Sequence, residues 1–599
     1  MKQQAIRQVA QVTTTPAPVK GLNAYDSIVA MPPGFAIVLR NFFAQPYGCQ
    51  VRKGYRKHVT EGILGNVESL ASHNGLTGSK LYAWALDNTT GTMYDVSTPN
   101  APAVQKLTGL KNARWQHCNL ANAAGVHMVC VNGEDNMIWV QPNDAIIQVT
   151  SGDGSVNTIS GVDPKTFIDV YSHQKRLWFV EKNSSRGWYL PPEQITGVAK
   201  SFNFGTNWTR GGYLSQIITW TIDDGNGADD HLAAISSEGQ VSIYTGTDVE
   251  AVDNWSLQGV YYAGAPAGRR AAVRYGGDIM MITEFGQVMM SDLLKSTKVN
   301  PAEQNFSKYV QQLISQAVSL SRDEFGWQPF IFPAENMVII NIPATKTTSY
   351  QLVMNDITKA WSEFIGYNAY CWELHEQLPF FGSFGGVYRA WEGTSDDGLL
   401  VNLIGGFDAS SGALPNDPLH TPYIKGDQYK ISGSGTLNLY NYSTKVATNI
   451  AVEAGGTITY YTSGTDPIGW YDGAPPADDI RAEAQTTFDY FGSLGQQKHF
   501  KMVRPTLLSR GDFSLNFSVN TDFVFNSPTA PASFTFTKPG VWNEDLWNSV
   551  TWGGGLSTYK SWQAVTGIGT AAGIRLLVRS QSETYWASTD WAYEMGGIL

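Results

Sequence analysis

A repeated unit of two short apolar runs joined by a polar or glycine-containing turn constrains this chain more than any other feature of its sequence. The first copy runs from Leu81 to Val96, with its turn over Asp87 to Thr92. Six further copies begin at His127, Leu177, Leu232, Ile279, Met337 and Phe380, at intervals of 43 to 58 residues. Paired apolar runs of this length on either side of a turn predict β-hairpins.

A hairpin that recurs roughly every 40 to 50 residues is typical of the blades of a β-propeller. Closing small sheets into a ring protects their edges, which explains how such short strands can be stable. The alternative is a set of unrelated β-sandwiches, because any long β protein contains hairpins at irregular intervals. Since the same order of strand, turn and strand recurs seven times, we predict an all-β chain with a propeller.

One segment departs from the β pattern. Between Pro301 and Leu320, apolar residues recur at every third or fourth position, which predicts an amphipathic helix inserted in the propeller. These residues are Phe306, Tyr309, Val310, Leu313, Ile314, Ala317 and Val318. We expect the helix to pack against the side of the propeller, with a neighbouring subunit as the alternative.

Changes in composition divide the chain into four parts. Residues 1–60 are assigned to an N-terminal arm with the first strands, and residues 61–404 to the propeller. Residues 405–490 are rich in Gly, Ser, Thr and Asp, and we assign them to a β insertion at a tip or outer face. Residues 491–599 return to strands and predict a C-terminal β-sandwich or jelly-roll-like module.

The charge of the chain limits its partners. With 41 Lys and Arg against 52 Asp and Glu, the formal net charge is −11. This balance argues against a protein that holds nucleic acid by neutralising its phosphates, but not against one that DNA slides past. Only 16% of the residues are charged while 12% are aromatic, which suits large buried or intersubunit surfaces.

Cysteine usage and apolar runs bear on the compartment. The cysteines, Cys49, Cys118, Cys130 and Cys371, are too few and scattered for a disulfide scaffold, so we expect them to be reduced. The N-terminus has no apolar signal region, and no run reaches the roughly 18 apolar residues that a membrane helix requires. We expect a soluble protein made in the cytoplasm, without membrane insertion.

The motifs of common enzymes are missing. The chain contains no G-x-S-x-G, GxxxxGK or H-E-x-x-H, and no G-x-G-x-x-G between a strand and a helix. A propeller glycosidase would need carboxylates converging on the central axis. The adjacent acids, Asp223 and Asp224, Asp229 and Asp230, Asp396 and Asp397, and Asp478 and Asp479, all lie in turn-like segments. The aspartate box of sialidase propellers also fails at Ser151 to Gly154, so we predict no catalytic residue and no enzyme.

Two groups of residues are candidate metal ligands. Asp224, Asn226 and Asp230 offer oxygen atoms for a structural calcium ion, but the loop lacks the closing Glu of an EF-hand, so an exposed loop is expected. His117, Cys118, His127 and Cys130 have a loose zinc-like spacing. If residues 127–131 form a strand, alternation sends His127 and Cys130 to opposite faces. We therefore predict no metal and no cofactor.

The C-terminal region is rich in tryptophan, whose rings can stack on sugars or bases. In a Gly-rich β module such residues more often fill a sandwich core or a protein interface, which is the prediction here. They are Trp542, Trp547, Trp552, Trp562, Trp586 and Trp591.

The N-terminal stretch carries the most specific motifs. They are residues 18–27 (PVKGLNAYDS), 31–36 (MPPGFA), 39–41 (LRN) and 48–55 (GCQVRKGY). These resemble the N-terminal signature of tail proteins of short-tailed bacteriophages. The wider layout is similar to the tail nozzle, or packaged-DNA stabilisation, family, including residues 327–333 (WQPFIFP), 336–343 (NMVIINIP) and 497–506 (QKHFKMVRPT). Residues 405–490 match nothing in that family.

The resemblance implies a structural role in the virion tail. Proteins of that family use a propeller in each subunit and form a hexameric ring below the portal and head-to-tail adaptor. The ring continues the DNA channel and retains the genome until ejection. The implied partners are further copies of the chain, the adaptor, a tail fibre or spike, and a tail needle or plug. DNA would pass through the lumen without sequence-specific binding, and the acidic balance fits such a wall.

A second class of function stays open. A propeller of the tail that binds or degrades host carbohydrate would share the same composition and repeats. A ring protein should assemble with the adaptor into a cyclic oligomer, whereas a depolymerase should degrade surface glycan when purified alone.

Overall fold

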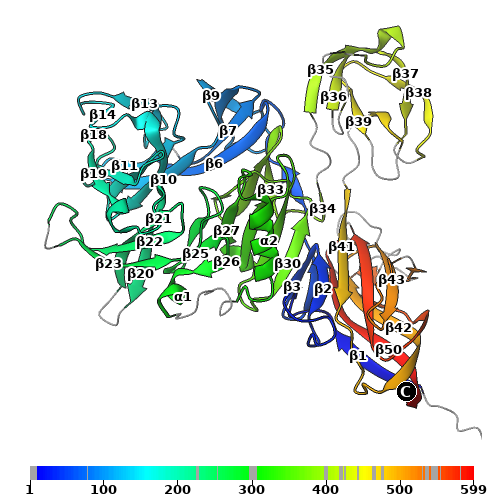
Figure 1. Ribbon diagram of the computed structural model, residues 1–599. Helices are drawn as coiled ribbons and strands as arrows, with labels where there is room; N and C mark the ends of the chain where they lie inside the picture. The colour runs from blue at the N-terminus through cyan, green and yellow to red at the C-terminus, as the bar shows by residue number, and fades with distance from the viewer. Residues whose placement is uncertain are drawn as a thin grey trace, which may run out of the picture.

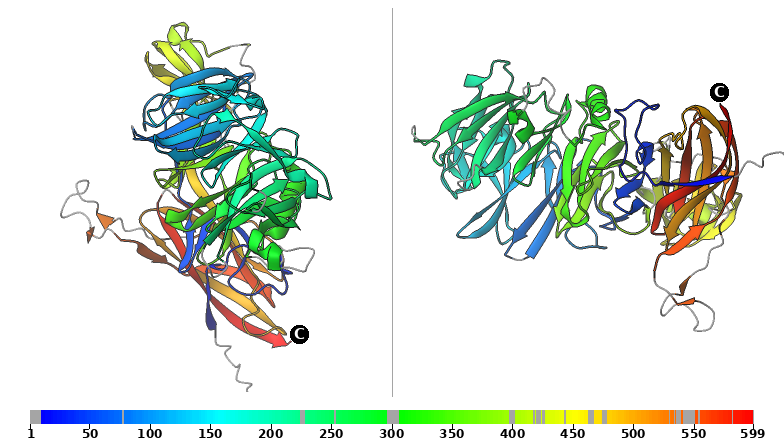
Figure 2. Two further views of the ribbon diagram at one scale, coloured as in Figure 1. Left: turned by 90° about the vertical axis from the view of Figure 1, so that its left-hand side faces the viewer. Right: turned by 90° about the horizontal axis from the view of Figure 1, so that it is seen from below.

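The computed structural model shows three lobes (Figure 1): a propeller, a separate β insertion, and a sandwich that combines the blue N-terminal strands with the orange and red C-terminal strands. Two further views show the propeller and the sandwich side by side, with the N-terminal strands between them (Figure 2). The structure describes residues 10–598 except for residues 77, 224–227, 252–253, 296–305, 397–401, 417, 419–422, 424–426, 442–443, 462–466, 474–477, 529, 533, 535–538, 541–550, 553–554 and 581.

Within these residues, five separate sheets and the two ends of a longer strand path make up the propeller. The separate sheets are β6–β9 (Asn66–Gly75, Gly78–Asp87, Thr90–Asp95, Val104–Leu110), β10–β13 (Gln116–Asn122, Gly125–Val131, Met137–Val140, Ile146–Ser151) extended by β14 (Thr158–Ser160) and β18 (Gly197–Val198), β15–β17 with β19 (Phe167–His173, Arg176–Glu181, Arg186–Tyr189, Lys200–Asn203), β20–β23 (Leu214–Asp223, Ala228–Ser236, Gln240–Thr245, Ser256–Tyr262) and β24–β26 (Ala272–Tyr275, Asp278–Thr283, Gly286–Met289). The two ends are β27–β30 (Gln328–Phe332, Met337–Pro343, Ser349–Asn355, Trp361–Ile365) and β31–β33 (Cys371–His375, Leu378–Ser383, Gly386–Ala390) with β5 (Tyr55–Lys57).

The predicted propeller is confirmed. Each of the seven predicted hairpins supplies the second and third strands of one of these sheets. The first strands pack side by side in the order β6, β10, β15, β20, β24, β27 and β31, and β31 packs on β6 to close the ring. Strand β5, from the N-terminal segment, becomes the outer strand of the last sheet.

The strands are apolar runs because both faces of each sheet are covered by a neighbouring sheet. In β11, Met128 and Cys130 pack into a cluster with Trp84 and Trp115 of the preceding part of the ring. Val129, on the opposite face, packs into a cluster with residues of β15 and β16. Burial on both faces explains why the repeats read as continuous apolar runs.

The inserted helix is present but shorter than predicted. Helix α2 spans Gln311–Ser321, residues 306–310 form turns, and residues 301–305 lie outside the described residues. Ile314, Ala317 and Val318 are buried in the main core cluster, and α2 packs on β26. The helix therefore covers the propeller side, as expected. A second short helix, α1 (Met290–Lys295), was not predicted.

The sandwich draws strands from both ends of the chain. One sheet holds β1 (Gln11–Pro16), β3 (Phe42–Gln45), β4 (Gly48–Val51), β42 (Gln496–Ser509), β47 (Ser557–Lys560), β48 (Gln563–Gly569) and β50 (Thr584–Ile598). The facing strands are β2 (Ala36–Arg40), β41 (Asp478–Thr486), β43 (Phe513–Thr521), β44 (Ala530–Pro531) and β49 (Ala572–Ser580), and the short β45 (Pro539–Gly540) pairs with β46 (Thr551–Trp552). Residues 11–51, which the sequence places in an N-terminal arm, thus pair with β41 and β50.

The insertion is a sheet of six strands with its own small core. The strands are β35 (Asn402–Asp408), β36 (Asp427–Gly433), β37 (Gly435–Tyr440), β38 (Ala447–Val452), β39 (Thr457–Tyr461) and β40 (Gly469–Asp472). Tyr429, Leu437 and Trp470 are among its buried residues. The chain enters the insertion through β34 (Ser395–Asp396), which pairs antiparallel with the start of β41, where the chain returns.

Candidate functional site

A buried arginine lies where the propeller meets the sandwich. Arg52, just after β4, is 2% exposed. Its guanidinium donates two hydrogen bonds to the carboxylate of Asp396, from Nη1 to Oδ1 at 2.7 Å and from Nη2 to Oδ2 at 2.6 Å. Nε donates to Asn41 Oδ1 at 3.0 Å, and the two Nη atoms also reach the carbonyl oxygens of Lys53 and Ile365. A buried charge needs this degree of pairing to be tolerated.

Asn41 extends the network to two further strands. Its Nδ2 donates to the carbonyl oxygen of Arg481 in β41 at 2.8 Å, and its Oδ1 accepts from the backbone N–H of Ile365 in β30 at 2.8 Å. The residue has a φ of 53°, in the left-handed region that Asn adopts more readily than most residues. Asn41 therefore positions the acceptor that Arg52 requires.

Aromatic rings enclose the guanidinium. The Tyr367 ring centroid lies 4.4 Å from Arg52 Cζ, and Tyr55 packs edge-on against Tyr367 with ring centroids 5.7 Å apart. Burial opposes the charge on Arg52, but Asp396 and Tyr367 outweigh it, so the pKa of Arg52 is raised and the side chain stays ionised.

We call the set Asn41, Arg52, Tyr367 and Asp396 the joint. It links β2, β30 and β41 with β34, the strand that leads into the insertion. The joint thus connects the sandwich, the propeller and the entry to the insertion. Asn41 and Arg52 belong to the N-terminal motifs that carry the family resemblance, and the structure gives both a positioning role in the fold.

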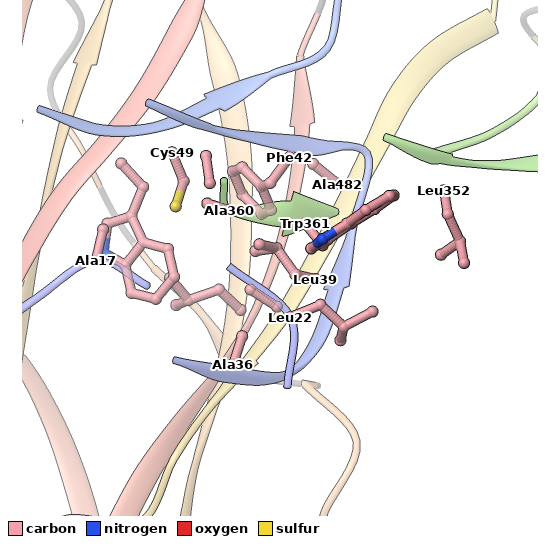
Figure 3. Packing of buried hydrophobic residues seen from close by; sticks show 14 of the residues in the cluster. Ala17, Leu22, Ala36, Leu39, Phe42, Cys49, Leu352, Ala360, Trp361 and Ala482 are labelled. Atoms are coloured by element: carbon pink, nitrogen blue, oxygen red, sulfur yellow. The ribbon is translucent and has the colours of Figure 1, made fainter. Parts of the chain in front are cut away.

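An apolar cluster lies beside the joint (Figure 3). Trp361, the first residue of β30, is 1% exposed and packs among residues of β2, β3 and β41, including Leu39, Phe42 and Ala482. Its indole Nε1 donates to the carbonyl oxygen of Phe306 at 3.1 Å. Its backbone carbonyl accepts from the N–H of Leu22 at 2.7 Å, so the N-terminal segment is also fastened here.

Replacing Gly54 with alanine should loosen the joint. A Cβ at this position would lie 1.7 Å from the carbonyl oxygen of Ser395, so β34 must shift. We expect a loss of about 1–3 kcal/mol in the free energy of unfolding, the usual cost of overpacking. Thermal unfolding measures it. Gly495→Ala is the matched control, because nothing lies within 4 Å of a Cβ there, and equal losses in both variants would contradict the expectation.

The propeller axis holds two neighbouring cavities. One, of about 340 Å³, is lined by the first strands of the sheets and includes His117, Asp169, Arg270 and Glu373. The other, of about 480 Å³, lies at the end of the axis where these strands begin, and is lined mainly by the connecting loops. Gln116 and Arg270 line both cavities.

Burial controls the charge of the axial acids. Loss of hydration raises the pKa of Asp169 to about 7 and that of Glu373 to about 8. Burial and the charge of Arg270 lower the pKa of His117 to about 4. The contact of 3.8 Å between His117 Nε2 and Glu373 Oε1 therefore joins two largely uncharged groups at neutral pH. Asp169 and Glu373 are single acids in the first strand of a repeat, and no motif or adjacent acid in the sequence marks them.

Asp169→Asn should make the free energy of unfolding less sensitive to rising pH. Because burial raises the folded-state pKa of Asp169 to about 7, its stabilising contribution is present below the unfolded pKa and is lost as pH rises through 7. Asparagine does not titrate. Between pH 5 and pH 8.5 the native protein should lose on the order of 2 kcal/mol relative to the variant, measurable as diverging unfolding temperatures. Parallel pH profiles would contradict this expectation.

Of the adjacent acids, only Asp229, Asp230 and Asp396 have described side chains, and none of these three lines either axial cavity. Asp396 is paired with Arg52 in the joint, and Asp230 accepts a hydrogen bond from Thr221 Oγ1 at 2.6 Å on an exposed hairpin. Asp478 lies opposite Asp396 in the strand pairing, with Asp479 next to it. Asp223 and Asp229 lie in paired strands of that hairpin, whereas Asp224 and Asp397 lie outside the described residues.

The proposed metal ligands have other roles or lie outside the description. Asp224 and Asn226 of the calcium candidate are not among the described residues. In the zinc candidate, Cys130 faces the core between the first two sheets, whereas His127 accepts a hydrogen bond from Trp139 Nε1 at 3.0 Å. Across the described part of the chain, no three His, Cys, Asp or Glu residues are grouped as metal ligands.

The structure describes the positions of four of the six C-terminal tryptophans. Trp586 and Trp591 are 0% and 1% exposed and fill the sandwich core. Trp562 stacks on Arg504, with 4.7 Å from Cζ to the ring centroid. Trp552 lies in β46, and Trp542 and Trp547 lie outside the described residues.

Comparison with protein-family models gives no match, and no curated protein matches the sequence. Among solved structures, the chain is similar to one titled "Crystal structure of BBS1N in complex with ARL6DN, soaked with mercury", at 10% identity and a TM-score of 0.34, over 57% of this chain and 96% of that one. It is also similar to "AfRom2 CNH domain", at 8% identity and a TM-score of 0.27, over 45% and 78% respectively. No helix among the described residues is long and apolar enough to span a membrane.

Proposed function

We propose that this protein is a structural subunit of the tail nozzle of a short-tailed bacteriophage. Copies of the chain, six by the family resemblance, would form a ring below the portal and the head-to-tail adaptor. The ring would continue the DNA channel, retain the packaged genome and allow its ejection. A tail fibre or spike and a tail needle or plug are the other proposed partners in the virion.

The observation that carries this proposal is the location of the family-like motifs. Asn41 and Arg52 of those motifs take part in the joint, which fastens the propeller to the sandwich. A wall that holds a pressurised genome must transmit force between its lobes without deforming. A buried, bidentate ion pair with aromatic packing is a specific and rigid connection. The net charge of −11 also suits a wall that does not trap DNA.

The alternative is a tail propeller that binds or degrades host glycan. Single acids near the propeller axis, Glu68, Asp169 and Glu373, together with a cavity of about 480 Å³, support it. Glu68, however, is paired with Arg114, from its Oε2 to Nε at 3.2 Å. The raised pKa values leave Glu373 largely protonated near neutral pH and Asp169 only partly ionised.

Assembly distinguishes the two functions. The full chain should be purified alone and together with the head-to-tail adaptor of the same phage, then examined by size-exclusion chromatography and negative-stain microscopy. The nozzle proposal predicts a discrete cyclic oligomer with the adaptor and no release of reducing ends from host polysaccharide. A chain that stays monomeric with the adaptor and depolymerises the glycan would overturn it.

A further inference from the structure

The cavity at the mouth of the propeller axis is lined by several cations. It has a volume of about 480 Å³, within the range of small-ligand sites. Loops from most of the ring contribute to it, and five basic side chains line it. They are Arg114, Lys182, Arg269, Arg270 and Arg322. Such a concentration stands out in a chain whose overall charge is negative.

Two of these cations are neutralised within the cavity. Arg114 pairs with Glu68 at 3.2 Å, and Lys182 Nζ lies 3.4 Å from Glu134 Oε1. For the other three, no carboxylate oxygen among the described residues lies within 4.0 Å of the guanidinium nitrogens. Asp323 and Glu324 also line the cavity but form no ion pair with them. The cavity therefore holds three arginines without a direct counter-charge.

Arg270 is held in place by neutral acceptors. Its Nη2 donates to Ser69 Oγ at 2.6 Å and to the carbonyl oxygen of Trp115 at 2.9 Å. Nη1 donates to the carbonyl oxygen of Glu68 at 3.1 Å, and Nε to Gln116 Oε1 at 3.3 Å. These bonds fix the guanidinium, but none of them is made to a carboxylate, and a partly buried ion without a direct ion pair is costly.

The arginines are also close to one another. Two guanidinium groups contact the Phe325 ring, with Arg114 Cζ 4.5 Å and Arg270 Cζ 5.2 Å from its centroid. Burial, together with the nearby charge of Arg114, lowers the pKa of Arg270. An added anion would relieve this repulsion.

We propose that this cavity binds a small ligand that carries phosphate groups. Three arginines that no described carboxylate pairs directly can each donate to a ligand oxygen, and guanidinium groups match phosphate oxygens in geometry. The volume exceeds that of a single phosphate and accommodates a diphosphate or a phosphorylated sugar. Ser215, Ser237 and Asn183, which also line the cavity, offer hydroxyl and amide groups to the remainder of such a ligand. This inference does not depend on the proposed nozzle function.

Calorimetric titration of the full chain with inorganic pyrophosphate tests the proposal, with glucose 1-phosphate in a second arm to separate a free phosphate source from a sugar phosphate. The double variant Arg269→Gln, Arg322→Gln should weaken binding at least about tenfold. Both side chains are exposed, so the unfolding temperature should not change. Arg579→Gln, on the exposed surface of β49, is the matched control and should bind like the native chain.

The outcomes separate clearly. Saturable binding of either probe to the native chain and the control, but not to the double variant, supports the site, and the arm that binds more tightly identifies the source. No binding of either probe at millimolar concentration would overturn the proposal. Equal binding by all three proteins would also overturn it, because it would mean general attraction of anions to surface arginines. Neither result bears on ring assembly.

Discussion

Arg52→Gln should lower the free energy of unfolding by about 3–5 kcal/mol, the range measured when one partner of a buried ion pair is removed. The substitution leaves the Asp396 carboxylate without the two charge-assisted hydrogen bonds that Arg52 supplies at 2.6 and 2.7 Å. It also removes the cation from the Tyr367 ring. The loss should appear in denaturant unfolding followed by tryptophan fluorescence.

The chain contains a matched control for this variant. Arg40 of β2 pairs with Glu363 of β30 at 2.7 Å, but its side chain is 45% exposed. Because exposed pairs contribute about 0–1 kcal/mol, Arg40→Gln should have little effect. Asp396→Asn should resemble Arg52→Gln, and the double variant should cost less than the two single losses added together. If Arg40→Gln and Arg52→Gln cost the same, the joint has no special importance.

The propeller could be predicted from the sequence because its signal is local. Each hairpin is formed by one continuous stretch of the chain, such as Leu81 to Val96. Because both faces of its strands are buried, the strands are apolar throughout. The closing strand was not predictable in this way. Tyr55 to Lys57 pairs with β33, more than 300 residues later, and three residues carry no periodicity.

The N-terminal strands show the same limit. Cys49 lies opposite Trp586 in the sandwich, and Val38 opposite Gln485. Such pairings depend on complementary faces far apart in the chain, which the local pattern does not encode. Residues 1–60 therefore looked like a separate arm, although most of their described strands complete the sandwich.

The two candidate sites differ in how they could have been found. Two residues of the joint, Asn41 and Arg52, lie in the N-terminal motifs and could be singled out from the sequence. Their partner Asp396 could not, because the sequence shows it only as one of two adjacent acids in a turn-like segment. The axial cavity had no motif, since Arg114, Arg270 and Arg322 come from three separate loops. Only the closed ring brings them together.

The same long-range fastening explains why the insertion can be large without disturbing the fold. The chain leaves the propeller through β34 and returns through β41, and these strands pair with each other beside the joint. The sheet of β35–β40 therefore projects from two strands, β34 and β41, that are held together by their pairing (Figure 1). In the proposed nozzle, such an attachment would let the insertion contact another tail component while the ring stays rigid.

Trp361→Ala should be the most damaging single change in the apolar part of this junction, with an expected loss of about 3–5 kcal/mol in the free energy of unfolding. The indole is 1% exposed and packs with the sandwich strands (Figure 3). The backbone of Gly21 packs closely on Trp361, since a Cβ at Gly21 would lie 2.5 Å from the Trp361 nitrogen. The surrounding structure therefore has little freedom to collapse into the cavity that the alanine variant would leave. Differential scanning calorimetry measures the loss.

Trp361→Phe is the control for size. It keeps an aromatic ring in the cluster but removes the indole N–H that donates to the Phe306 carbonyl oxygen at 3.1 Å. It should cost roughly 1–3 kcal/mol, the penalty for a buried acceptor left without its donor, and so less than alanine. If the cluster transmits the attachment between lobes, Trp361→Ala should also split the calorimetric transition, because the propeller and the sandwich would then unfold separately. A single transition at the native temperature would show that the two lobes are held together elsewhere.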